Sequence, residues 1–306
     1  MSSLRAELGE YLAVRRALGY KLDTAERLLC QFLDYLEERG EQQITIEHAL
    51  AWAILPGGQA SWHAHRIQTL RRFARYLHAA DPEVEIPPAG LLTGRSRRAT
   101  PYLYTDEQID ALITAAEMLG TAHRTASFQT LIGLLAVTGM RIGEAIALDR
   151  DDLDCEHGVL VVEGKYGKTR ELPLDQSTVD ALRRYLRRRD RPPSLSGERA
   201  LLVSEAGTRL LLPNIEHAFG KLRRRAGIAP RSAACRPRLH DIRHSFAVRT
   251  LLDAYRTEAD VGGRLALLST YLGHVEPAMT YWYLDTAPEL MGLAAERLER
   301  SIGRAR

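Results

Sequence analysis

Apolar positions in roughly the first 80 residues repeat every three to four residues, which is the period of an α-helix. One such stripe lies within residues 4–12 and a second within residues 28–36. The second helix is expected to end at Gly40, a third to begin after Thr45 as its N-cap, and a fourth to begin near Ser61. The pattern therefore predicts an N-terminal bundle of four helices with little strand content.

A stretch rich in proline and glycine, and then in arginine, follows this bundle between Asp81 and Pro101. Such a composition is typical of a linker between domains, because it supports neither a helical stripe nor the alternation of a strand. We place an N-terminal domain at residues 1–94, a basic linker at 95–101 and a second domain at 102–306.

The second domain opens with a helix start at Thr105, where acidic residues occupy the first turn. The helical pattern continues to Gly139, which is expected to end one helix, and Arg141 is expected to begin the next. After residue 154 the period changes, and Gly164 and Gly167 bracket the turn of a short hairpin. Helix returns after residue 177, with loops at 191–197 and 227–234. The predicted fold class is mainly α with a small β-hairpin or sheet: a helical bundle followed by a mixed α/β domain.

The composition places the chain among globular proteins without a membrane segment. Its 306 residues are 45% hydrophobic, and the sequence contains no run of about 18 uncharged apolar residues. The N-terminal residues include acids and lack the apolar segment of a signal peptide, so we expect a cytoplasmic protein. Cys30, Cys155 and Cys235 stand far apart without CxxC spacing, so neither a disulfide framework nor a metal site is expected.

The net charge is only +3, but the basic residues are clustered. Several clusters in one chain are typical of a protein that contacts a phosphate backbone, although any single cluster is more often a solvated helix face. The clusters are Arg71, Arg72 and Arg75, then Arg95, Arg97 and Arg98, then Arg183 to Arg191, and then Lys221 with Arg223 to Arg225. Their number favours nucleic acid as the partner.

Four side chains near the C-terminus combine groups that can bind and attack a phosphodiester. His240 and Arg243 lie three positions apart, His274 ends a Leu-Gly-His sequence, and Tyr283 follows nine residues later. Histidine and arginine donate charge-assisted hydrogen bonds to phosphate oxygens, and a phenol can act as a covalent nucleophile. Taken alone, the His240–Arg243 pair is more typical of an ordinary helical turn, and Tyr283 of a core residue.

Two basic residues earlier in the chain extend this set. Arg141 follows the glycine turn with Glu144 three residues on, at a helix N-terminus that favours a bound phosphate, and Lys165 lies at the tip of the predicted hairpin. With these residues the chain resembles the tyrosine recombinases, the family of phage integrases and Xer-like site-specific recombinases. The resemblance covers nearly the whole chain, includes the two-domain organisation, and rests on five stretches in order: TGMRIGEAIAL, VEGKYGKTRELPL, HDIRHSFAVRTLL, YLGH and TYWYL.

The resemblance implies a basic clamp on the scissile phosphate. Arg141 and Arg243 correspond to the arginine pair of the family that holds this phosphate, and Lys165 corresponds to the hairpin lysine that protonates the departing 5′ oxygen. Preorganised cations of this kind stabilise the negative charge of a pentacovalent transition state more than the ground state.

The remaining residues of the set correspond to the nucleophile and its neighbours. Tyr283 corresponds to the nucleophile, His240 to the histidine that transfers a proton near it, and His274 to a position that hydrogen-bonds the phosphate. Glu144 corresponds to an acidic supporting position. A tyrosine phenol has a pKa of about 10, so it needs a base or nearby cations to react at neutral pH.

The resemblance also implies the partners. It predicts a SAM-like core-binding domain at the N-terminus, double-stranded DNA as substrate, and a homotetramer on paired sites, with related recombinases or DNA-bending proteins as further partners. The helix after Pro288 is expected to dock on a neighbouring subunit, while packing on its own domain remains the alternative. No metal is expected. No ATP is expected either, because the phosphotyrosine bond conserves the energy of the broken phosphodiester. The residues expected to contact DNA are Arg66, Arg71, Arg72, Arg75, Arg95, Arg97, Arg98 and Lys168.

Two choices of residue depend on spacing. Tyr281 competes with Tyr283 for the nucleophile, and residues two apart on a helix point to different sides, so only one of them can face the arginines. We choose Tyr283 for its offset from His274. His244 is expected to face away from its neighbour Arg243 and to act in packing.

The 31 residues from Arg243 to His274 predict an enlarged loop around Thr257–Gly263, which we associate with recombinases of mobile elements. Two other functions stay open at this point: relaxation of DNA by a type IB topoisomerase, and DNA binding without catalysis. The sequence specifies neither the target DNA nor the choice among integration, excision, dimer resolution and transposition.

Overall fold

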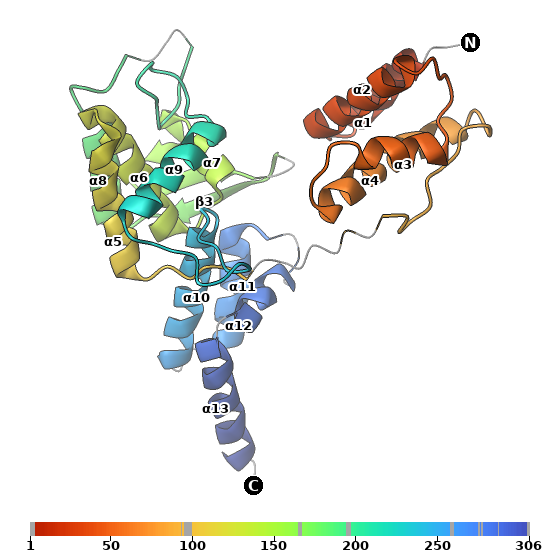
Figure 1. Cartoon of the computed structure of the whole chain (residues 1–306). Helices are drawn as coiled ribbons and strands as arrows, with labels where there is room; N and C mark the ends of the chain where they lie inside the picture. The colour runs from red at the N-terminus through yellow and green to blue at the C-terminus, as the bar shows by residue number, and fades with distance from the viewer. Residues whose placement is uncertain are drawn as a thin grey trace. The chain divides into compact units, whose positions relative to one another are not determined.

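The computed structural model describes residues 4–92, 94, 100–164, 167–193, 197–257, 260–274, 276, 278–286 and 288–304. The chain divides into two units, Met1–Arg98 and Ala99–Arg306, each with its own apolar core (Figure 1). The division falls within the segment predicted to be a basic linker. Arg95, Arg97 and Arg98 of that linker, and Lys165 of the hairpin, lie outside the described residues.

In its described residues the N-terminal unit forms four helices: α1 (Leu4–Ala17), α2 (Asp23–Glu37), α3 (Ile46–Ile54) and α4 (Ala60–His78). Their apolar stripes meet in one core, where the rings of Phe32 and Trp52 pack edge to face with centroids 5.2 Å apart. Thr45 caps α3 by accepting a hydrogen bond from the amide of His48, as predicted. Helix α4 begins one residue before the predicted cap Ser61, after Gln59, whose side chain makes no cap hydrogen bond.

The C-terminal unit combines helices with one small sheet. Its elements are α5 (Asp106–Ala115), η1 (Ala116–Leu119), α6 (Ala122–Thr138), α7 (Ile142–Ala147), η2 (Arg150–Asp152), β1 (Leu153–Asp154), β2 (Val159–Glu163), β3 (Thr169–Pro173), α8 (Gln176–Leu186), α9 (Leu212–Arg225), α10 (Asp241–Arg256), α11 (Val261–Leu272), α12 (Ala278–Thr286) and α13 (Pro288–Arg304). This architecture confirms the predicted fold class, mainly α with a small sheet.

The sheet has the antiparallel order β1-β2-β3, and β1 is a short strand that the sequence did not predict. Val162 pairs with Arg170 and Leu160 with Leu172, so these four residues share one face of the hairpin. Leu160, Val162 and Leu172 are fully buried on that face. Arg170 therefore points inward with three apolar side chains, which is unusual for a charged residue.

Helices α10 to α13 enclose a second core within the C-terminal unit, at one side of it (Figure 1). Leu251 of α10, Leu272 of α11, Tyr283 of α12 and Leu290 of α13 all belong to this core. The first turn of α13 thus packs on its own unit, and Arg256 forms an ion pair with Glu289 at 2.6 Å.

Two predictions about loops are wrong. An enlarged loop was expected at Thr257–Gly263, but α10 runs to Arg256 and α11 begins at Val261, where Asp260 caps it, so residues 261–263 belong to a helix. Residues 258 and 259 lie outside the described residues. The stretch after residue 197, predicted as helix, carries β-bridges that pair Asp149 with Ala200 and Val203 with Arg209.

Among the described residues, no helix is both long enough and apolar enough to cross a lipid bilayer.

Candidate active site

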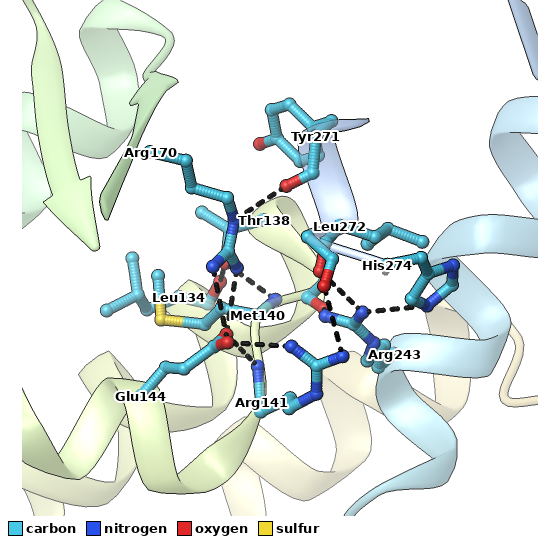
Figure 2. A network of polar contacts seen from close by, with 12 residues as sticks. Leu134, Thr138, Met140, Arg141, Glu144, Arg170, Arg243, Tyr271, Leu272 and His274 are labelled. Atoms are coloured by element: carbon cyan, nitrogen blue, oxygen red, sulfur yellow. Dashed lines mark hydrogen bonds and ion pairs between the residues drawn. The ribbon is translucent and has the colours of Figure 1, made fainter. Parts of the chain in front are cut away.

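Five of the six residues predicted to be catalytic are described. Three of them, Arg141, Arg243 and His274, meet in one polar network with Glu144 (Figure 2). Tyr283 joins them through its contacts with His274 and Arg243. They come from α7, α10, α12 and the turn after α11. The sixth residue, Lys165, lies outside the described residues.

The turn before Arg141 depends on glycine. Gly139 ends α6 in the left-handed conformation, with φ of 59°, and an added Cβ there would collide with the ring of Phe246. The turn directs the Gly139 carbonyl to Arg243, whose Nη1 donates a hydrogen bond to it at 2.8 Å. It also makes Arg141 the N-cap of α7. The short connection between α6 and α7 therefore contributes both Gly139 and Arg141 to the site.

Glu144 joins two arginines. Its carboxylate accepts hydrogen bonds from the backbone amide and Nη1 of Arg141, both at 2.8 Å, and from Nη1 and Nη2 of Arg170 at 3.2 and 2.8 Å. The side chain of Glu144 is buried, which by itself raises the pKa of a carboxyl group. The hydrogen bonds and charge from the two arginines outweigh burial, so the pKa of Glu144 lies below its ordinary value and the group is ionised at neutral pH.

Arg243 is more buried than Arg141 and Arg170. Besides Gly139 it donates from Nη2 to the Leu272 carbonyl at 2.7 Å and to Nε2 of His274 at 3.0 Å. Burial, opposed by the nearby Tyr283 phenol and reinforced by the charge of Arg141, lowers the pKa of Arg243 to about 10. The guanidinium therefore remains charged at neutral pH although its surroundings are poor in water.

The C-terminal end of α11 collects three arginines (Figure 2). The last carbonyls of a helix have no partner within the helix and form the negative end of its dipole. Here the carbonyl of Tyr271 accepts from Nε of Arg170 at 2.8 Å, and that of Leu272 accepts from Arg243. The Gly273 carbonyl accepts from Nη2 of Arg141 at 3.4 Å, the longest of the three bonds. Three cations are thus held close together around one helix end.

His274 is neutral in this arrangement. An arginine can only donate, so Nε2 of His274 is an acceptor, and its proton lies on Nδ1, which contacts Thr280 Oγ1 at 2.7 Å. Burial and then the charges of Arg243 and Arg141 lower the pKa of His274 to about 4. The ring also stacks on that of Tyr283, with centroids 5.9 Å apart.

Helix α12 turns Tyr283 into the site and Tyr281 away from it. The side chain of Tyr283 is 3% exposed and that of Tyr281 is 55% exposed. The Tyr283 phenol interacts with the guanidinium of Arg243 by charge and by hydrogen bonding. The geometry therefore brings Tyr283, and not Tyr281, to Arg243.

His240 and His244 lie one helical turn apart on α10, and their rings meet edge to face at 4.8 Å. His240 is open to solvent at one side; partial burial and the charge of Arg243 lower its pKa. His244 is buried against the rings of Trp282 and Tyr283, at 4.9 and 5.4 Å, and burial followed by the charge of His240 lowers its pKa to about 3. His244 is a packing residue, as predicted, but the side chain that it packs against is the candidate nucleophile.

Arg170 is a residue of this site that sequence reasoning missed, and for His244 it missed the contact with the ring of Tyr283. The signal for Arg170 was present in the alternation of the hairpin, because Arg170 shares a face with the apolar Leu172. An arginine on an inward face needs a buried partner. For His244, the helical spacing of four from His240 was the available signal.

Arg66, one of the residues predicted to contact DNA, is buried in the N-terminal unit. Its side chain is 6% exposed, with the guanidinium carbon 3.7 Å from the centroid of the Trp52 ring and Nη2 donating to the Trp52 carbonyl at 2.9 Å. Desolvation lowers the pKa of Arg66. Arg66 belongs to the core of the N-terminal unit because it occupies the buried face of α4.

The other predicted DNA contacts differ in exposure. Arg72 and Arg75 are exposed on the face of α4 opposite Arg66, Arg71 is half-buried, and Lys168 is exposed beside the hairpin turn.

Within the described part of the chain, no group of three or more histidine, cysteine, aspartate or glutamate side chains is arranged to hold a metal ion.

Comparison with known proteins gives one consistent result. Residues 103–289 match the model of the phage integrase family. A putative integrase/recombinase of Sinorhizobium fredii, y4rB, is 44% identical over 308 residues, which cover 98% of this chain and 98% of the relative. The chain belongs to the phage integrase family, the tyrosine recombinases, and the resemblance inferred from its motifs is confirmed.

Solved structures share the fold at low identity. XerH recombinase bound to a palindromic difH substrate, in a post-cleavage complex, matches with a TM-score of 0.66 and 19% identity over 91% of this chain and 80% of its own. A lambda integrase tetramer bound to a Holliday junction matches with a TM-score of 0.62 and 19% identity over 92% of this chain and 77% of its own. At this identity the likeness establishes the architecture alone.

Proposed function

We propose that this protein is a site-specific recombinase that cleaves and rejoins DNA through a 3′-phosphotyrosine intermediate formed by Tyr283. The observation that carries the proposal is the convergence of the Tyr283 phenol with the guanidinium of Arg243, beside Arg141 and His274. A phenol held against a cation is favoured in its ionised, nucleophilic form, and paired guanidinium groups suit a phosphodiester.

In the proposed cleavage step, the Tyr283 oxygen forms a bond to the scissile phosphorus, and the bond from phosphorus to the 5′ oxygen breaks. The electron pair of the broken bond stays on the 5′ oxygen, which takes a proton from the ammonium of Lys165. The phenolic proton passes to His240, whose lowered pKa leaves it neutral and able to accept it at pH 7. Attack by the 5′ hydroxyl of a partner strand reverses these steps and joins the exchanged strands.

The arginines take up the negative charge of the transition state. Arg141 is the more accessible of the two, with a side chain about one third open to solvent and a long bond to the Gly273 carbonyl that a phosphate oxygen can replace. Loss of one such donor is expected to cost on the order of 10²–10³ in the cleavage rate, by analogy with oxyanion-hole donors. His274 supports this clamp by holding Arg243, since Nε2 already accepts from that guanidinium.

The basic face of α4 provides the proposed contact of the N-terminal unit with the DNA backbone. Replacement of the exposed Arg72 by alanine should remove one phosphate contact and reduce the slope of log K against log salt by about 0.9, with unchanged stability. Replacement of the buried Arg66 by alanine should leave that slope unchanged and destabilise the N-terminal unit by about 2 kcal/mol, because it removes a desolvated cation–π contact and a hydrogen bond.

Titration of binding at several salt concentrations, together with urea unfolding followed by hydrogen exchange of peptides from α3 and α4, separates these two effects. An Arg66→Ala protein with native stability and the reduced salt slope would show that Arg66 reaches DNA after all.

The experiment that tests the proposed function uses a nicked suicide duplex made from the DNA that flanks the gene, where inverted repeats around a short spacer would mark the target. The native full-length protein is expected to form a covalent adduct with the fragment that carries the 3′ phosphate at the cut, while the other fragment is released with a 5′ hydroxyl. The adduct is detectable on a denaturing gel and by mass spectrometry as a nucleotide-modified peptide containing Tyr283. Absence of any adduct would favour a DNA-binding relative without catalysis. Adduct formation with relaxation of supercoiled DNA, but without joining of two sites, would indicate a topoisomerase.

The assembly follows the same proposal. The lambda integrase relative was solved as a tetramer on a Holliday junction, and strand exchange between two sites needs four cleavages. We therefore propose a homotetramer on paired sites, acting on double-stranded DNA in the cytoplasm and nucleoid of a bacterial cell. The start of α13 packs on its own unit through the Leu290 core contact and the Glu289 ion pair. The later part of this amphipathic helix is the segment that we propose to dock on a neighbouring subunit.

A further inference from the structure

Arg170 occupies a position where a charged side chain is costly. It lies on the inward face of β3, beside Leu172, and its side chain is only 14% exposed. The Cβ that an alanine would add at Gly273 would lie 3.1 Å from Nη1 of Arg170, so the guanidinium fills the space under the turn after α11. A cation buried this deeply persists only where several acceptors surround it.

Those acceptors belong to two different segments. Nη1 and Nη2 bind the two oxygens of Glu144 on α7, and Nε binds the carbonyl of Tyr271 at the end of α11 (Figure 2). Arg170 therefore joins α7 to α11 through one rigid, planar group. Arg141 binds the same Glu144 carboxylate, and it also binds the Gly273 carbonyl at the same helix end.

Loss of Arg170 would leave Glu144 and the helix end connected only by Arg141 itself. Arg141 would then have to bind both Glu144 and the Gly273 carbonyl to keep the segments together, and it would no longer be free to exchange the carbonyl for a phosphate oxygen. The bond from Arg141 to the Gly273 carbonyl can remain long, at 3.4 Å, because Arg170 already holds the helix end through its 2.8 Å bond to the Tyr271 carbonyl.

We propose that Arg170 is a positioning residue of strand cleavage, which holds Glu144 against the end of α11 so that the guanidinium of Arg141 is oriented toward the scissile phosphate. This inference rests on the proposed function. It assigns Arg170 no contact with DNA: its three nitrogen atoms are all engaged within the protein.

The test is a double-mutant cycle in the full-length protein, read as the rate of adduct formation on the nicked duplex at saturating DNA. Arg170→Met is expected to lower this rate by about 10–100-fold in the native background and by less than about threefold when Arg141 is already alanine, because Arg170 acts through Arg141. Arg170→Lys keeps the charge but cannot donate to Glu144 and Tyr271 in the same fork geometry, so an intermediate loss is expected. The affinity for DNA should stay within about twofold in both variants.

Arg209 offers a matched control. It is also an arginine that joins carboxylates to backbone carbonyls, namely Asp149 and Glu198 to Ile146 and Leu148, but none of these groups contacts Arg141. Arg209→Met is expected to lower the thermal midpoint about as much as Arg170→Met and to leave the cleavage rate within about threefold of native.

Four results would contradict the positioning role of Arg170 or the proposed function. Equal losses from Arg170→Met in the presence and absence of Arg141, or an equal loss of rate in Arg209→Met, would overturn the positioning role. Native-like cleavage by a folded Arg170→Met protein would overturn it as well, while leaving the proposed function intact. Failure of the native protein to form any adduct would instead refute the proposed function.

Discussion

Replacement of Tyr283 by phenylalanine is expected to abolish covalent attachment to DNA, with a fall in rate of at least about 10⁴-fold, whereas replacement of Tyr281 by phenylalanine should leave the rate within about threefold of native. The physical reason is that only the Tyr283 phenol lies against Arg243, while Tyr281 is turned to solvent. Phenylalanine retains the ring that stacks on His274 and packs against His244, so the fold of α12 should not change.

Adduct formation on the nicked suicide duplex measures this difference, and binding to the same duplex without a nick serves as the control for folding. Both variants should bind this intact duplex like the native protein. If Tyr283→Phe still forms the adduct, or if Tyr281→Phe does not, the assignment of the nucleophile is wrong.

Replacement of Glu144 by alanine is expected to destabilise the C-terminal unit by about 3 kcal/mol, near the lower end of the range for breaking a buried ion pair, because Arg141 retains some exposure to water. The substitution leaves Arg141 and Arg170 without the carboxylate between them, and their mutual repulsion is then unopposed. Cleavage should fall together with stability, since the orientation of Arg141 depends on the same carboxylate.

Replacement of Glu144 by glutamine removes the negative charge and keeps the shape of the side chain. The contribution of that charge to the free energy of unfolding can then be measured as a function of pH. The pKa of Glu144 is lowered in the folded protein, so its charge adds stability that is fully present above the ordinary value of 4.5 and is lost as the pH falls through the lower folded value. The free energy of unfolding of the native protein should therefore exceed that of Glu144→Gln by a constant amount from pH 7 to about pH 5, and the difference should shrink below pH 4.5.

Urea unfolding followed by hydrogen exchange of peptides from α6 and α7 reports on the C-terminal unit alone. A stability difference that stayed constant down to pH 3 would show that the shape of the carboxyl group, and not its charge, holds the two arginines.

The sequence predicted the fold where local chemistry determines it. Thr45 and Thr105 cap their helices because a hydroxyl three residues before a free amide satisfies that amide whatever surrounds it. Gly139 ends α6 because a left-handed turn excludes most other residues. The family and the fold class could thus be predicted from motifs and periodicity, and both predictions are confirmed.

Predictions failed where partners come from distant parts of the chain. Arg66 and Arg72 look alike in sequence, but the first lies over Trp52, which is 14 residues away, and the second is exposed. Arg170 meets Tyr271 across 101 residues, and no local pattern specifies such a contact. The short connection between α10 and α11 was missed because a count of residues does not distinguish a loop from an extended helix.

The two ends of α11 differ in how well they should tolerate inserted residues. Residues added between Arg256 and Val261 would change only the entry to α11 and would leave the carbonyls of Tyr271, Leu272 and Gly273 in place. A single residue inserted within the helix would rotate those carbonyls by about 100° relative to the rest of the unit and would remove the acceptors of all three arginines at once. The two ends of one helix therefore differ in how strictly their length is constrained, although their distance in sequence is only a dozen residues.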